Sequence, residues 1–89
     1  VMSLRDEVDT EVVSLLQSLK ALGDKNPDSA IGGAFDDFNR LLECAKEAFP
    51  DARSIQEMGH IISGDSITTV VAKLSIIKGA IDATKSTPA

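Results

Sequence analysis

The strongest helical pattern in the chain lies between residues 65 and 85, DSITTVVAKLSIIKGAIDATK. β-Branched residues are frequent here and favour strands, but the apolar positions recur at steps of three and four, which is typical of an α-helix. At about 100° per residue they share one face: Ile67, Val70, Val71, Leu74, Ile77 and Ile81. We therefore expect a helix over 65–85 that Asp65 caps, directly after a Gly64 that ends the preceding helix.

A second stripe of mostly small residues lies on the opposite side of this helix. It consists of Thr69, Ala72, Ile76, Ala80 and Ala83. A helix at the edge of a bundle needs only one apolar stripe, so two stripes predict either a central helix or a helix that binds a partner. Helix propensity alone would explain the alanines, and single exposed apolar residues are common. The large apolar side chain of Ile76, in the middle of the second stripe, favours a helix that is buried on both of its apolar sides.

The first half of the chain predicts two long helices. The first helix is predicted over residues 3–22. It begins with a capping pattern at Ser3, and Gly23 terminates it. Residues 28–49 carry one apolar stripe that holds all three phenylalanines, and the rest of their circumference is largely charged. The pair Gly32–Gly33 marks either a close approach to another backbone or a late start of this helix. The apolar stripe of the first helix consists of Leu4, Val8, Val12, Leu15, Leu19 and Leu22.

A short third helix is predicted over 54–63. Ser54 and Glu57 form a capping-box pattern at its start, and Gly64 ends it. Because the helix over 65–85 follows at once, we expect a tight corner between the two. The sequence thus predicts an all-α fold, a small four-helix bundle of three long helices and one short third helix. It also predicts that residues 1–89 form a single domain.

Composition narrows the classes of partner. The chain has 89 residues, of which 43% are hydrophobic and only 3% aromatic, so one largely aliphatic core is expected. The net charge of −5 argues against nucleic acid, which needs a basic surface, and against anionic membranes. A basic protein partner is compatible with it, although acidity also keeps a small protein soluble. One cysteine and the lack of a secretory or membrane-spanning pattern predict a cytoplasmic protein.

Residues suited to catalysis or metal binding are sparse. His60 and Cys44 are the only histidine and cysteine, and they lack the spacing of a metal site. A nucleophilic pair would need them side by side, whereas we expect His60 in solvent and Cys44 as a partly covered filler. No calcium loop or phosphate loop is present. We therefore expect no enzymatic activity, no cofactor and no metal.

The stretch from His60 to Gly64 resembles the phosphoacceptor segment of histidine phosphotransfer domains, which are also helical bundles. In that family an exposed helical histidine is followed by lysine three residues on and glycine four residues on. Gly64 matches this pattern, and Ser63 replaces the lysine that supports the phosphoryl group. The resemblance implies a signalling protein with His60 as its phosphoacceptor.

The hypothesis that the pattern favours is a non-enzymatic, helical protein–protein interaction module. Its partner is another protein or a second copy of the chain. The predicted partner-binding residues are Thr69, Ala72, Ile76 and Ala80 on the second stripe. Two alternatives stay open: a phosphotransfer protein that uses His60, and a carrier of a lipid or other apolar ligand in the aliphatic core.

Overall fold

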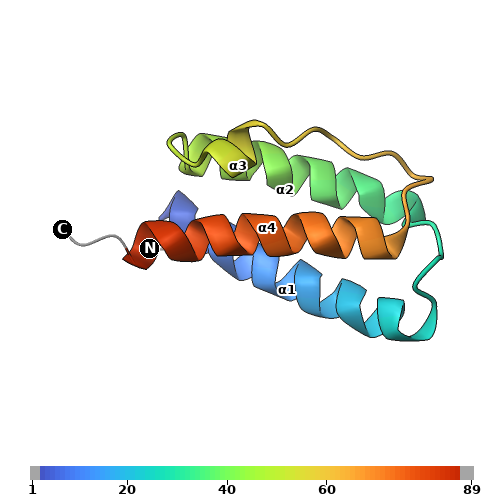
Figure 1. Ribbon diagram of the computed structural model, residues 1–89. Coiled ribbons are helices and arrows are strands. Elements are labelled where there is room, and N and C mark those ends of the chain that lie inside the picture. The colour runs from blue at the N-terminus through green and yellow to red at the C-terminus, as the bar shows by residue number, and fades with distance from the viewer. Residues whose placement is uncertain (1–2, 87–89) are drawn as a thin grey trace.

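The computed structural model describes residues 3–86, with side chains described as far as Thr84. In this range the chain forms an all-α bundle, as predicted. Its elements are α1 (Leu4–Lys25), a 3₁₀ turn (Gly32–Ala34), α2 (Phe35–Ala48), α3 (Arg53–Gln56) and α4 (Ile67–Ser86). α1 packs against both α2 and α4. Figure 1 shows that α2 and α4 run in the same direction and that α1 runs opposite to both.

The first helix begins as predicted and ends later than predicted. The Ser3 hydroxyl accepts a hydrogen bond from the Asp6 amide at 3.2 Å, which confirms the cap. The predicted end at Gly23 is wrong, because the helix continues to a cap at Asn26. At Gly23 the helix passes close to the start of α4, where an added Cβ would lie 3.3 Å from Ile67 Cγ2. This glycine therefore permits a close approach of two helices instead of ending one.

The second helix starts at Phe35, so the predicted start at residue 28 is wrong. Gly32 has a φ of 64°, a left-handed conformation that favours glycine and cannot continue a helix. The segment before it is held by an antiparallel bridge between Ala30 and Ser66. Ile31 donates its amide hydrogen to the Asp65 carbonyl oxygen at 2.7 Å as part of this contact. Of the two alternatives for the glycine pair, the late helix start is the one observed.

The predicted third helix over 54–63 is wrong in length. α3 stops at Gln56, and residues 57–66 form an irregular crossover that runs back along the bundle to α4 (Figure 1). Because α2 and α4 are parallel, this connection has to span the length of α2, roughly 21 Å for its 14 residues. Ten helical residues would reach only about 15 Å, whereas ten extended residues reach about 33 Å. The expected tight corner is therefore replaced by an extended connection.

Asn39 fixes this crossover to α2. Its side-chain amide donates to the Ile61 carbonyl at 2.9 Å, and its side-chain oxygen accepts from the Ile61 amide at 2.8 Å. Ile61 is only 3% exposed, so the pair of bonds satisfies a buried peptide. Almost three turns beyond Asn39, the Gln56 side chain donates to the Phe49 carbonyl at 3.2 Å and closes the end of α2.

The fourth helix starts two residues later than predicted, with a different cap. Its first residue is Ile67, and the Ser66 hydroxyl accepts from the Thr69 amide at 3.2 Å. The Asp65 carboxylate, which was the predicted cap, instead accepts from the Ile62 amide at 3.0 Å. Ser66 therefore caps the helix, and Asp65 stabilises the turn before it.

The core is one aliphatic cluster with three partly or fully buried phenylalanines. Phe38 and Phe49 are buried and Phe35 is half-buried, in agreement with the predicted stripe of the second helix. Leu4 and Leu22, which were predicted to lie on the buried face of the first helix, are 41% and 52% exposed. Both lie on one edge of that stripe, and α2 and α4 cover its centre and its other edge.

Replacing Asn39 with Ala is expected to lower the free energy of unfolding by about 2–3 kcal/mol. Two hydrogen bonds are lost, and the buried Ile61 peptide is left without partners. Urea unfolding measures the change. The Asn39→Asp variant keeps the acceptor for the Ile61 amide but sets a carboxylate oxygen against the Ile61 carbonyl oxygen, so at neutral pH it should be no more stable than Asn39→Ala. An Asn39→Ala protein as stable as the wild type would show that this pair of bonds does not hold the crossover.

Candidate binding face on α4

α4 buries one of its two apolar stripes and exposes most of the other. Four residues of the first stripe are completely buried, namely Val70, Leu74, Ile77 and Ile81. On the opposite side Ile76 is 51% exposed, and Thr69 and Ala72 are also exposed. Ala80 is half-buried. The second stripe is therefore mostly uncovered within the chain, and the predicted burial of this helix on both sides by the chain itself is wrong.

The exposed surface of α4 differs from that of α2 in charge. Every exposed residue of α2 is charged, namely Asp36, Asp37, Arg40, Glu43 and Glu47. Up to Thr84, the exposed residues of α4 are uncharged except for Asp82, namely Thr68, Thr69, Ala72, Ser75, Ile76, Gly79, Asp82 and Ala83. Charged residues make up 26% of the chain, so this surface is poor in charge, with Lys73 as the partly exposed charge nearest to Ile76. Depletion of charge is typical of the centre of a protein interface.

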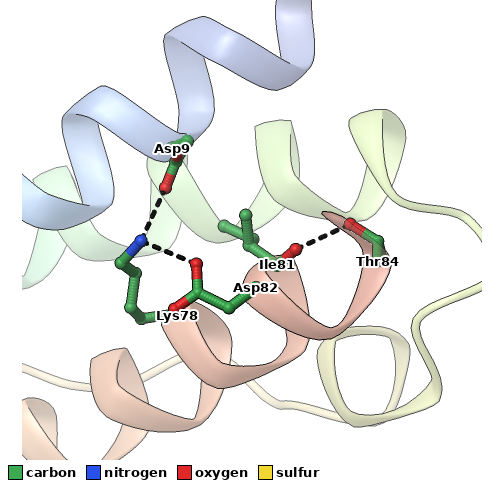
Figure 2. A network of polar contacts seen from close by, with 5 residues as sticks. All are labelled: Asp9, Lys78, Ile81, Asp82 and Thr84. Carbon is green, nitrogen blue, oxygen red and sulfur yellow. Dashed lines mark hydrogen bonds and ion pairs between the residues drawn. The ribbon is translucent and has the colours of Figure 1, made fainter. Parts of the chain in front are cut away.

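A polar network holds two of the charges on α4 at its border with α1. Figure 2 shows Lys78 Nζ donating to the Asp9 carboxylate of α1 at 3.2 Å and to the Asp82 carboxylate at 2.8 Å. The bond to Asp82, and next the bond to Asp9, raise the pKa of Lys78 above its ordinary value. In the same view the Thr84 hydroxyl donates to the Ile81 carbonyl at 2.7 Å. These contacts keep a cation and an anion away from the surface around Ile76.

A shallow groove adjoins the second stripe near the end of α4. Its volume is about 380 Å³, and its lining consists of Asp51, Ala52, Arg53, Ser54, Ala80, Ala83 and Thr84. The groove exists because alanine side chains of α4 face the start of α3 and fill little space. Ile76 lies one turn of α4 before Ala80. The exposed Ile76 thus lies about one turn from a groove whose lining mixes alanines with polar and charged side chains.

His60 lies in the crossover and not on a helix. Its Nε2 atom is 3.0 Å from Oε2 of Glu43, and both side chains are more than half exposed. The family resemblance implied a helical phosphoacceptor, whereas the backbone at His60 is irregular. Cys44 lines a groove between α1 and α2. The histidine and the cysteine therefore lie on different sides of α2 and do not form a catalytic pair.

Two further findings concern residues 3–86. In this range no three histidine, cysteine, aspartate or glutamate side chains are arranged to hold a metal ion. Over the same residues, no helix has both the length and the apolar character needed to cross a bilayer. No protein family, curated protein or solved structure matches the chain.

Replacing Lys78 with Met is expected to lower the stability by about 0.5–1 kcal/mol near neutral pH, because partly exposed ion pairs are weak. The folded protein binds this proton more tightly than the unfolded chain, in which the lysine pKa is 10.5. The stabilisation is thus complete below that value and is lost as the pH rises through the higher folded pKa.

Chemical unfolding of both proteins across the alkaline range measures this effect. The difference in stability should disappear at the alkaline end. Lys73→Met removes the same charge from the same helix and serves as the control for the loss of a lysine from α4. A wild-type advantage that persists at the highest pH would show that the charge of Lys78 is not its source.

Proposed function

We propose that this protein is a non-enzymatic interaction module that self-associates through the second stripe of α4. This stripe is called the outer stripe from here on, and its partner-binding residues are Thr69, Ala72, Ile76 and Ala80. The observation that carries the proposal is the half-exposed Ile76 among small uncharged side chains, with the partly exposed Lys73 as the charge beside them. Burial of apolar surface is the main driving force of protein association. The stripe carries no acidic side chain, which lets two chains that each carry a net charge of −5 meet there without carboxylate repulsion in the contact.

The stripe is symmetric about Ile76. Ala72 and Ala80 lie four residues to either side, and Thr69 and Ala83 lie seven residues to either side. A two-fold axis beside Ile76 would pair two α4 helices in antiparallel orientation, with isoleucine against isoleucine and small residues against small residues. This self-complementary arrangement is what a two-fold dimer requires. The small residues allow the two helix backbones to approach closely.

The dimer is expected to be weak. Burying the exposed half of Ile76 contributes about 1 kcal/mol per chain, and the alanines add less. Association costs roughly 4–15 kcal/mol in lost translational and rotational freedom. Because these gains are small against that cost, we expect a reversible dimer that is populated only as the protein concentration approaches the millimolar range.

The two alternatives have less support. An exposed His60 is accessible to a phosphodonor, but its Nε2 faces the Glu43 carboxylate at 3.0 Å, which would repel a phosphoryl group. An apolar ligand in the core would need space there. Large core side chains such as Phe38, Leu42 and Leu74 are completely buried in one continuous cluster. The outer stripe therefore remains the better-supported site.

Ile76→Asp is expected to abolish self-association, because it places a carboxylate next to its symmetry mate in the centre of the interface. Sedimentation velocity over a wide concentration range measures the monomer–dimer equilibrium. The wild type should shift towards the dimer as its concentration rises, and Ile76→Asp should stay monomeric.

Ile62→Asp is the matched control. Ile62 is 67% exposed but lies on the crossover, so the same change of residue and charge should leave the dimer intact. A wild-type protein that stays monomeric at millimolar concentration would contradict self-association. Equal loss of the dimer in both variants would contradict the assignment to α4.

A further inference from the structure

A second groove lies between α1 and α2. It measures about 460 Å³, and its lining consists of Glu11, Ser14, Leu15, Ser18, Asp37, Arg40, Leu41 and Cys44. Leu15 and Cys44 are half-buried and Leu41 is 5% exposed, so the floor is apolar. The other residues of the lining are polar or charged and form the rim, namely Glu11, Ser14, Ser18, Asp37 and Arg40. An apolar floor with a polar rim is the usual composition of a binding groove.

The groove faces away from α4. On α1, Asp9 contacts Lys78 of α4, whereas Leu15 lines the groove. At about 100° per residue these two side chains lie about 120° apart around the helix axis, and Glu11 lies about 160° from Asp9. The groove and the outer stripe of α4 are therefore separate surfaces, and a partner in one does not occupy the other.

An uncovered edge of α1 extends the floor of the groove in both directions. Leu4 and Leu22 lie within about 20° of Leu15 around the helix, and they are 41% and 52% exposed. From Leu4 to Leu22 this edge is about 27 Å long. A helix laid between α1 and α2 would cover all three leucines over about five turns. A four-helix bundle has four long helices, whereas this bundle has three within residues 3–86. A helix bound between α1 and α2 would take the position of the fourth.

The charges around the groove are mainly negative. Glu11 and Asp37 line it from opposite helices, and Glu7 is exposed one turn before Glu11. Arg40 is the cation in the lining, and it is paired with Asp36 at 3.2 Å. Together with the net charge of −5, this rim favours an occupant with positive charges beside its apolar stripe and disfavours an acidic one.

We propose that the groove between α1 and α2 binds a cationic amphipathic helix from another protein. The helix presents one row of aliphatic side chains to Leu15, Leu41 and Cys44, and its lysines or arginines lie beside Glu11 and Asp37. This is the helix-in-groove mode of recognition, in which one apolar face gives affinity and the flanking charges give specificity. The proposal stands independently of self-association through α4.

Cys44, the only cysteine of the chain, is a built-in reporter for the test. The probe is a designed helical peptide of about 18 residues, long enough to cover the edge of α1, with leucines at helical spacing and lysines elsewhere. A second peptide carries the same leucines with glutamates in place of the lysines. The leucine–lysine peptide should slow the reaction of Cys44 with a thiol reagent in a saturable manner, and the leucine–glutamate peptide should not.

Charge-reversal variants test where the peptide binds. Glu11→Lys with Asp37→Lys should weaken binding of the leucine–lysine peptide by about tenfold or more, since each reversal turns an attraction into a repulsion. The matched control, Asp28→Lys with Glu57→Lys, changes the net charge equally at exposed positions away from the groove and should weaken binding far less. Ile76→Asp should leave the affinity unchanged, which separates this site from the outer stripe of α4.

Several results would overturn the proposal. One is equal protection of Cys44 by both peptides, which would show that charge does not select the occupant. A second is equal weakening by the two charge-reversal pairs, and a third is loss of binding in Ile76→Asp. Protection of Cys44 that rises with protein concentration in the absence of peptide would show that a second copy occupies the groove instead.

Discussion

The buried stripe of α4 is the interaction on which the rest of the structure depends. Val70, Leu74 and Ile77 are completely buried in the common core with residues of the other helices. α4 packs against α1 and α3, and its side around Ile76 is left in solvent. The parallel arrangement of α2 and α4 in turn requires the long crossover. The burial of one stripe thus determines both the topology and the exposed face.

The polar contacts of the bundle support this arrangement instead of competing with it. Asn39 holds the crossover at Ile61, and the bridge between Ala30 and Ser66 ties the two connections together at one end of the molecule. Lys78 joins α4 to α1 and draws charge to their border. The surface around Ile76 is apolar and carries no acidic side chain of the stripe, although Lys73 lies one turn away on the same side of α4.

Local sequence rules predicted what depends on neighbours in the chain and missed what depends on distant contacts. The helical spacing of α4 and the cap at Ser3 involve residues within a turn or two, and both were predicted. Gly23 was interpreted as a helix end, but its role is set by Ile67, which is far away in the sequence. Asn39 drew no attention because a single asparagine on the polar side of a helix has no distinctive pattern. The exposure of Ile76 depends on how many helices surround α4, which periodicity does not specify.

Methyl NMR with a soluble paramagnetic agent tests the central claim most directly, because it reads the two sides of α4 in one sample. Ile77 should be protected from the agent at every protein concentration, since it is completely buried. Ile76 should be strongly affected in dilute solution and become protected as the concentration rises. Protection of Ile76 in dilute solution would contradict the exposed face. Exposure of Ile76 that persists at the highest concentration would contradict its role as a contact surface.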